Sequence, residues 1–407
     1  MHVAGIVAEY NPFHSGHRYQ IRQTRQLLGE DCPVVAVMSG NWVQSGAPAA
    51  ADKWLRARMA LMGGVDLVLE LPTPWALSSA EAFAGGAVWL LHAAGVVTHL
   101  SFGSEGGQVE PLAQAARCLD DPAFPALLGQ ALADGSSFAA GRQRAAEQLA
   151  GPEVGALLSA PNNNLGVEYL RALRRWDSRI QPITVRRVGA GHNHFCSHRP
   201  EHLSATQIRS LLLEDDWQNC APYLEPQAAA LLRSAPRITQ DSLALAQRLI
   251  LARLRGMDEE DWARLPDGGA GEGLNRRLAR AGRQAASLEE FYTLAKTKRY
   301  AHARLRRLAL WAYLGLDENS RPQHPPYLRV LGCTSRGQEL LARMRKEAAL
   351  AVLTKPAHVR RLEPQAQTIF QQETRCTDLY DLLLTPLLPG GREWRTGPER
   401  WEGGPTP

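Results

Sequence analysis

The chain of 407 residues lacks several patterns that would assign it to a common class of protein. Its six cysteines are scattered without CxxC spacing, so we expect reduced thiols rather than a disulfide framework. No apolar run approaches 18 uncharged residues, and the first residues lack the basic region of a secretion signal. These absences predict a soluble, cytoplasmic protein without a membrane anchor.

The composition is that of a globular protein, with 44% apolar and 21% charged residues. A chain of this length exceeds one ordinary domain, so two hydrophobic cores are expected. The net charge of +5 is small. It permits a polyanionic partner without requiring one, and the distribution of the charge matters more than its total.

The most informative segment is residues 4–20, in which an apolar strand runs into Asn11-Pro12-Phe13-His14-Ser15-Gly16-His17 and then into a helix. It is neither a Walker loop nor a Rossmann GxGxxG turn. The N-terminus of a helix that follows a parallel strand offers unpaired N–H groups and a positive dipole end to phosphates. Imidazoles add further N–H donors. The bare motif also allows a second interpretation, a helix start with two surface histidines.

The HxGH pattern resembles the signature of the nucleotidyltransferase superfamily, whose members attack the α-phosphate of ATP and expel pyrophosphate. Ser204-Ala205-Thr206-Gln207-Ile208-Arg209 resembles the second signature of that superfamily, SxTxIR, in which hydroxyls and an arginine at a helix N-terminus hold the triphosphate. Alone, this block could be an ordinary helix cap. Together, the two blocks indicate an ATP site.

Apolar strands alternate with amphipathic helices over the first half of the chain. We expect strands at 3–8, 33–38, 65–71, 97–102 and 183–188, and helices at 19–28, 52–62, 79–94 and 167–175. This alternation predicts an α/β fold with a parallel, Rossmann-like sheet, and its site should lie at the carboxyl ends of the strands. Residues 108–158 are Ala- and Leu-rich and read as a helical insertion.

The second half has helical periodicity almost throughout from about residue 234. We therefore expect a catalytic domain at 1–233, a mainly α-helical domain at 234–388, and a disordered Gly/Pro-rich tail at 389–407.

Further blocks resemble one particular family. These are GIVAEYNPFHSGHRYQI, MSGNWVQSGAPAAADKWLRARMALMGGVDLVLELP, SFGSE, APNNNLGVEYLRAL, VRRVGAGHN and TKRYAHARLRR. In that order they resemble the tRNA(Met) cytidine acetate ligase family over residues 1 to about 385. The resemblance implies a ligase that adenylates acetate with ATP, with Mg²⁺ as the expected companion ion. It then transfers the acetyl group to N4 of the wobble cytidine (C34) of elongator tRNA(Met), which gives N4-acetylcytidine.

The resemblance also implies the site residues. His14 and His17 would be catalytic donors, aided by the N–H of Gly16, by Arg209 and by Mg²⁺, and no side chain is assigned as a metal ligand. The nucleotide would contact a larger set, which comprises Ile6, Val7, Ala8, Glu9, Tyr10, Asn11, Pro12, Phe13, His14, Ser15, Gly16, His17, Arg18, Tyr19, Gly103, Asn162, Arg187, Ser204, Thr206 and Arg209. Asn162 is preferred over its two asparagine neighbours because it directly follows Pro161.

One loop departs from the family pattern. The family usually has an arginine and an acidic residue where this chain has Ser45 and Ala47. Lys53 is a candidate to replace the missing charge. The role of the loop in this chain is therefore open.

A basic segment in the second half is a candidate RNA surface. We expect a single helix with an apolar stripe of Ala301, Leu305, Leu308 and Ala312, and with cations from Lys296, Lys298, Arg299, Arg304, Arg306 and Arg307. Further cations lie at 276–277, 343–346 and 360–361. A solvated helix face is the alternative, and the family resemblance favours RNA. Tyr300 and Trp311 are expected to be core residues.

Two other interpretations stay open. His192, His194, Cys196 and His198 could alternate along a strand as metal ligands, although we favour loop histidines near phosphate. The alternative functions are a small-molecule cofactor adenylyltransferase and a non-catalytic RNA-binding protein on the same fold. Both histidines and the SxTxIR block are present, which favours an enzyme. Protein partners and the oligomeric state are left open by the sequence.

Overall fold

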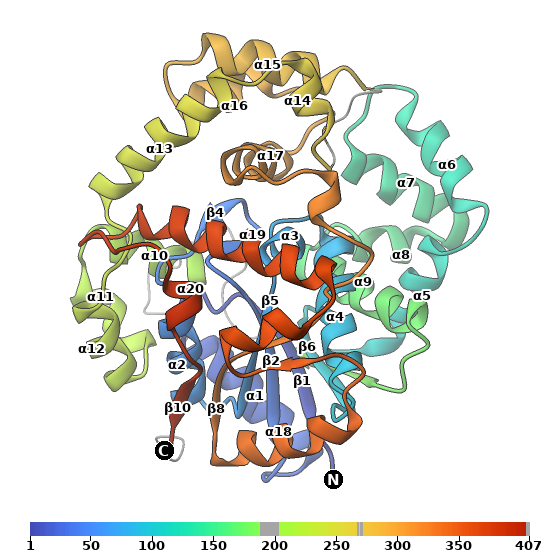
Figure 1. Ribbon diagram of the computed structural model, residues 1–407. Coiled ribbons are helices and arrows are strands. Elements are labelled where there is room, and N and C mark those ends of the chain that lie inside the picture. The colour runs from blue at the N-terminus through green and yellow to red at the C-terminus, as the bar shows by residue number, and fades with distance from the viewer. Residues whose placement is uncertain (188–202, 267, 269–271, 404–407) are drawn as a thin grey trace.

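The computed structural model describes residues 1–187, 203–266, 268 and 272–403. A twisted sheet lies at the centre, and helices cover both of its faces (Figure 1). Its strands run in the order β10-β8-β5-β2-β1-β6-β7, with β9 beside β8. The strands of this sheet are β1 Ala4–Ala8, β2 Val34–Ser39, β5 Leu67–Leu71, β6 His99–Ser104, β7 Gln181–Arg186, β8 Leu328–Thr334, β9 Val352–Leu353 and β10 Glu399–Trp401. A separate hairpin joins β3 Trp42–Val43 to β4 Ala47–Pro48.

The five strands expected from the first half of the sequence are confirmed, and they pair in parallel. All side chains of β2 and β5 are buried. This is why both strands read as continuous apolar runs rather than as alternating patterns. Residue 188, the expected end of the last strand, lies outside the described residues.

Four helices fill the expected insertion beside the sheet (Figure 1), and the first of them, α5 Val109–Leu119, contacts β7. The asparagine block belongs to the next helix, since α9 begins at Pro161 rather than at Val167. A proline at the first helical position suits a helix start, because its missing N–H would be unpaired there in any case. Helices of the first half are α1 Ser15–Leu28, α2 Lys53–Met62, α3 Thr73–Ala76, α4 Ala80–Ala93, α5 Val109–Leu119, α6 Phe124–Leu132, α7 Phe138–Ala150, α8 Pro152–Leu157, α9 Pro161–Arg175, α10 Ala205–Leu213, α11 Trp217–Cys220 and α12 Pro226–Ser234.

The second half has a helical core of its own, which forms an arc above the sheet in Figure 1. Leu254, Leu278, Phe291 and Leu305 are fully buried in this core. The helices of the second half are α13 Gln240–Arg255, α14 Glu259–Ala263, α15 Leu274–Gln284, α16 Leu288–Ala295, α17 His302–Leu314, α18 Ser335–Glu347, α19 Pro364–Asp381 and α20 Arg392–Arg395. Helix α18 packs against the strand β8 rather than in the arc. Among the described residues, none of the helices combines the length and apolar character needed to cross a membrane.

Residues 234–388 are mainly α-helical, as expected, but they also contain the strands β8 and β9, which were not expected. Strand β8 joins the sheet of the first half, antiparallel to β5. The expectation of a disordered tail is wrong for residues 389–403, since β10 pairs with β8 and Glu393 is fully buried. A three-residue strand among glycines and prolines leaves no periodic signal, so only its pairing partner identifies it.

The basic segment is not one helix. Lys296 caps the end of α16, and residues 296–301 form a connection before α17 begins at His302. Lys298 and Arg299 are exposed on this connection, whereas Arg306 and Arg307 lie on α17. Ala301 is exposed and does not belong to the apolar stripe. The Lys296 ammonium donates to the carbonyls of Thr297 and Tyr300, so it closes the connection on itself.

A buried charge cluster ties the two ends of the chain together. The Nζ atom of Lys53 lies 2.6 Å from Glu70 Oε1 and 2.6 Å from Glu393 Oε2, and the three side chains are almost fully buried. Lys53 therefore does not replace the missing charge of the loop at Ser45 and Ala47. Glu373 completes the cluster and accepts hydrogen bonds from the backbone N–H and the hydroxyl of Thr73.

The stability of the protein is expected to fall as the pH rises, because Glu373 in this cluster loses a proton. Burial and the charge of Glu70 raise the pKa of Glu373 to about 8. The folded state then holds a proton that the unfolded state has lost, so stability is full below the unfolded pKa of 4.5 and is lost as pH rises toward 8. One proton accounts for at most about 1.4 kcal/mol per pH unit.

The measurement is the free energy of unfolding in urea at pH 5.5 and pH 7.5. Glu373→Gln should reduce the difference between the two pH values, because the amide has no proton to lose. Glu363→Gln, at the exposed start of the same helix, is the matched control and should leave the difference unchanged. If Glu373→Gln shows the same difference in unfolding free energy between the two pH values as the wild-type protein, the pH dependence does not come from Glu373.

Candidate active site

The sheet opens where strand order reverses. Strands β1 and β2 pair along their whole length, whereas β1 and β6 pair only at Ala4 with His99 and Gly5 with Leu100. Beyond these pairs the two strands diverge, and the side-chain amide of Gln20 donates to the carbonyl of Ser101 at 3.2 Å. This divergence leaves a crevice at the carboxyl ends of β1 and β6. Such a topological switch point is the usual ligand site of an open α/β sheet.

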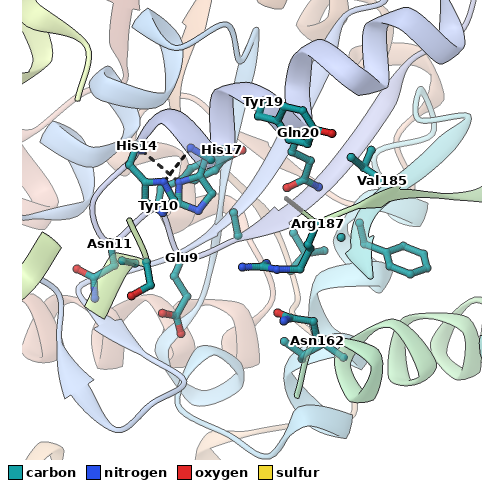
Figure 2. A pocket seen from close by; sticks show the side chains of 18 of the residues that line it. Glu9, Tyr10, Asn11, His14, His17, Tyr19, Gln20, Asn162, Val185 and Arg187 are labelled. Atoms are coloured by element: carbon teal, nitrogen blue, oxygen red, sulfur yellow. Dashed lines mark hydrogen bonds between the residues drawn. The ribbon is translucent and has the colours of Figure 1, made fainter. Parts of the chain in front are cut away.

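A cavity of about 310 Å³ occupies this crevice (Figure 2). Its volume falls within the range of small-molecule sites, which starts at about 300 Å³. The helices α1 and α10 both begin at its wall, at His14 and at Ser204. Two helix N-termini at one cavity favour an anionic ligand. Arg186, the last residue of β7, and Arg187 add cationic groups to the cavity wall.

The two imidazoles lie against each other, with ring centroids 3.9 Å apart. His14 Nδ1 accepts the N–H of Gly16 at 3.0 Å, and His17 Nδ1 accepts the N–H of His14 at 3.2 Å. Figure 2 shows both bonds as dashed lines. Because each Nδ1 atom accepts, the neutral form of each ring carries its proton on Nε2. Both rings line the cavity, so the pair can present Nε2–H donors to a ligand.

The protonation state of His17 follows from its surroundings. Burial, the neighbouring His14 and Arg187 lower the pKa of His17 well below 6.5. The ring is therefore neutral near pH 7, and it donates a hydrogen bond without adding a charge.

The glycine between the histidines has a steric role. A Cβ atom on Gly16 would lie 2.9 Å from His14 Cε1 and 3.1 Å from His14 Nδ1. A side chain here would displace the imidazole from its capping position. The N–H of Gly16, which we expected to face a phosphate, instead donates to His14, so the assignment of that N–H to the ligand is wrong.

The cavity wall contains thirteen of the twenty residues expected to contact the nucleotide. They are Val7, Ala8, Glu9, Tyr10, Asn11, His14, Gly16, His17, Tyr19, Gly103, Asn162, Arg187 and Ser204. Of the three neighbouring asparagines, Asn162 lines the cavity, and its side-chain amide donates to Glu105 Oε1 at 2.9 Å.

The other seven expected residues are placed behind the wall or away from it. Ile6 and Phe13 are core residues, at 1% and 2% exposure. Arg209 donates to the carbonyl of Asn11 and to the hydroxyl of Thr206. It thus supports the turn after β1. Ile6, Pro12, Phe13, Ser15, Arg18, Thr206 and Arg209 are the residues of this group.

Ser204 has a structural role that the sequence left open. Its hydroxyl accepts the N–H of Gln207, and the Gln207 side chain accepts the N–H of Ser204, which forms a capping box. The helix-cap interpretation is confirmed, and Ser204 also lines the cavity.

Glu9 brings a carboxyl group to the cavity wall. Its Oε1 atom accepts the N–H of Gln44 at 2.9 Å. Burial raises the pKa of Glu9, and Arg209 and the Gln44 N–H offset part of this rise.

Several lining residues were not expected from the sequence. Leu165 and Tyr169 lie on α9, three and seven positions after Asn162, and Gln20 lies three positions after His17 on α1. Residues at these spacings share one face of a helix. Helical periodicity, counted from Asn162 and His17, is sufficient to predict all three.

The string His192, His194, Cys196 and His198 lies outside the described residues. Within the described part of the chain, no group of three or more His, Cys, Asp or Glu side chains is placed to hold a metal ion.

The fold, the switch-point cavity and the imidazole pair define a nucleotidyltransferase. A family model described as HIGH Nucleotidyl Transferase matches residues 1–389. The tRNA(Met) cytidine acetate ligases of Syntrophomonas wolfei and Clostridium kluyveri are 35% and 36% identical to this chain, over 98% and 94% of it and over 99% and 95% of their own lengths. The chain belongs to the tRNA(Met) cytidine acetate ligase family.

Solved structures of a relative have the same fold as this chain. The crystal structure of Thermotoga maritima TmcAL bound with alpha-thio ATP superposes with a TM-score of 0.90 at 32% identity, and the match covers 99% of this chain and 100% of that one. The apo form of the same protein gives the same TM-score at 31% identity.

Proposed function

We propose that this chain performs the reaction for which its family is named. It uses ATP to activate acetate as acetyl-adenylate, and it transfers the acetyl group to N4 of the wobble cytidine of elongator tRNA(Met). The observation that carries the proposal is the pair of Nε2–H donors at a cavity where two helices begin. The membership of the family supports it.

In the first step an acetate oxygen attacks the α-phosphorus of ATP. A P–O bond to acetate forms, the P–O bond to pyrophosphate breaks, and negative charge grows on the phosphate oxygens. The carboxylate is already a nucleophile, so this step needs no general base. His14 and His17 stabilise the growing charge by donating from Nε2, and the helix N-termini at His14 and Ser204 add favourable dipoles.

We expect Mg²⁺ to accompany the triphosphate, where it would neutralise phosphate charge. This ion usually keeps phosphate and water ligands and takes only one or two protein carboxylates. Glu9, at the cavity wall, fits that donor set.

In the second step the N4 amine attacks the acetyl carbonyl carbon. A C–N bond forms, the bond to AMP breaks, and the amine loses a proton. An anticodon-loop base is a feasible substrate because it is unpaired and can leave its stack at modest cost. We assign RNA binding to the basic side chains of the connection before α17 and of α17 itself, namely Lys296, Lys298, Arg299, Arg306 and Arg307.

The test is incorporation of labelled acetate into RNA. Label should appear in tRNA(Met) only with ATP present, and a transcript with uridine at the wobble position should stay unlabelled. Acetate-dependent exchange of pyrophosphate into ATP reports the first step alone. A dinucleotide-like product from a small phosphate ester would instead indicate a cofactor adenylyltransferase. RNA binding without exchange or labelling would indicate a non-catalytic protein.

A further inference from the structure

Glu105 connects two segments of the chain that meet at the wall of the catalytic cavity. It directly follows β6, and Asn162 and Asn163 belong to the first turn of α9. The side-chain amide of Asn162 donates to Glu105 Oε1 at 2.9 Å. The backbone N–H of Glu105 donates to Asn163 Oδ1 at 3.3 Å. Two hydrogen bonds therefore hold the end of β6 against the start of α9.

The three consecutive asparagines have different roles. Asn163 is 4% exposed and accepts the backbone N–H of Glu105. Asn164 accepts a hydrogen bond from Arg142, so it contacts the helical insertion. Of the three, Asn162 lines the cavity. The pair of Glu105 and Asn162 is thus the part of this contact that a ligand in the cavity can meet.

The orientation of the Asn162 amide follows from its partner. A carboxylate accepts hydrogen bonds and does not donate them, so the amide must turn its NH2 group toward Glu105. The Oδ1 atom of Asn162 is left as an acceptor, and no donor in the described part of the chain bonds to it. Because Asn162 lines the cavity, a ligand there meets a fixed acceptor.

The cavity wall beside Asn162 suits a flat base. Leu165 and Tyr169 lie three and seven positions farther along α9, on the same face, and both line the cavity. The Tyr169 ring packs edge-on against Phe102 of β6, with ring centroids 5.8 Å apart. Asn162 itself lies across the cavity from the imidazole pair (Figure 2). Since the imidazoles are expected to meet the phosphates, the base is expected at this more apolar end.

A buried hydroxyl on the same helix face also indicates a ligand. Tyr169 is 5% exposed, and within the described residues its hydroxyl forms no hydrogen bond. Burial raises the pKa of this phenol, so the hydroxyl keeps its proton near pH 7. Buried polar groups normally have a hydrogen-bond partner. A ligand in the cavity can supply the missing one.

The two common purine bases differ in the group that this acceptor would meet. Adenine carries an exocyclic amino group, which donates, whereas guanine carries a carbonyl oxygen at the same position, which accepts. A fixed acceptor on the wall attracts the first and repels the second. An amide that is free to turn would instead donate to guanine equally well, because it carries both kinds of group. Discrimination therefore requires that a neighbouring group hold the amide.

We propose that Glu105 is a positioning residue that makes the cavity selective for adenine. It holds the Asn162 amide so that Oδ1 accepts from the exocyclic amino group of the base, and Glu105 itself does not contact the nucleotide. Cytosine carries the same kind of donor, so the experiment also separates these two bases. The inference rests on the proposed function, in which ATP is the substrate of the first step.

The experiment compares ATP with purine riboside triphosphate, which lacks only the amino group. The measurement is kcat/KM for acetate-dependent exchange of pyrophosphate into each nucleotide. With the wild-type protein, the value for the analogue should be about 3-fold to 10-fold lower, which is the effect of one hydrogen bond between neutral groups. The difference should appear in KM, because the base is remote from the reacting phosphate. With Glu105→Met, ATP and the analogue should react nearly alike, and the preference for ATP over GTP should fall.

Further variants separate positioning of the amide from a fold defect. Glu105→Gln keeps an acceptor for the Asn162 amide and should retain most of the discrimination. Asn162→Ala removes Oδ1 and should abolish it, and Glu105→Met should then cause no further loss. Glu110→Met, at an exposed glutamate in the first turn of α5, is the matched control and should keep the wild-type ratio.

Two outcomes overturn the proposal. One is full discrimination between ATP and the analogue in Glu105→Met. The other is unchanged exchange with a loss confined to acetyl transfer, which would assign the acceptor to the N4 amine of cytidine. Failure of the proposed function looks different, because the wild-type protein would then show no acetate-dependent exchange with either nucleotide. In that case competition between the two nucleotides for binding still tests Glu105.

Discussion

Replacement of His14 or His17 by alanine is expected to slow acetyl-adenylate formation by about 30-fold to 1,000-fold, which corresponds to about 2 to 4 kcal/mol for each donor lost. The reason is the orientation of the His14 and His17 imidazole rings. Both Nδ1 atoms accept backbone N–H groups, so each neutral ring carries its donor on Nε2. The measurement is acetate-dependent exchange of pyrophosphate into ATP.

A matched variant separates catalysis from helix capping at His14. Alanine removes both the Nε2–H donor and the acceptor for the Gly16 N–H, and the lost cap costs about 1 kcal/mol of stability. Asparagine is itself a preferred cap residue and can accept the same N–H, but its amide is shorter than the imidazole. His14→Asn should therefore unfold at nearly the wild-type temperature and yet stay impaired in exchange. Wild-type exchange in His14→Asn would mean that the imidazole acts only as a cap.

The pH profile gives an independent check on His17. Its lowered pKa keeps the ring neutral between pH 6 and 8, so the rate of exchange should show no step near pH 6.5 that belongs to this residue. A step there in the wild-type protein that disappears in His17→Gln would show that the ring titrates in the working range.

Lys53→Met is expected to have the largest effect on stability, a loss of about 3 to 5 kcal/mol in the free energy of unfolding. The substitution removes the charge between Glu70 and Glu393, each 2.6 Å from the ammonium, and leaves two carboxylates in a buried site. Burial makes an unpaired charge costly. The loss should appear as a lower urea midpoint at pH 7.

Arg58→Met is the matched control for this prediction. Arg58 lies on the same helix α2 and also pairs with a residue of the C-terminal segment, Glu399, at 3.5 Å. Its side chain is 40% exposed, however, and surface pairs contribute about 0 to 1 kcal/mol. Equal effects of the two substitutions would contradict a buried cluster around Lys53.

Local pattern was sufficient to predict the strands of the first half and the cavity they surround. The parallel strands are buried on both faces, so each reads as an apolar run, and the connecting helices are amphipathic. The HxGH turn is local as well, since the cap of α1 involves only residues 14–17. His14, His17 and Asn162 line the cavity because their positions follow from strand ends and helix starts.

The sequence did not predict structural elements whose formation depends on partners distant in the chain. Strand β10 is three residues long and becomes a strand only beside β8, and β8 itself was hidden among helical periodicity. The basic segment was read as one helix because its cations and apolar residues fit a single period. The chain instead ends α16 at Ala295 and starts α17 at His302.

The sequence by itself therefore determined the nucleotide-binding half of this protein: the parallel sheet, the imidazole pair and the family. Only the tertiary structure decided that Lys53 is a buried partner of Glu393 and that the strand β10 joins the sheet beside β8. The physical reason is the distance along the chain over which each kind of interaction acts. Periodicity and capping act between residues a few positions apart, whereas burial and charge pairing depend on which distant segments meet, and a single sequence does not display that.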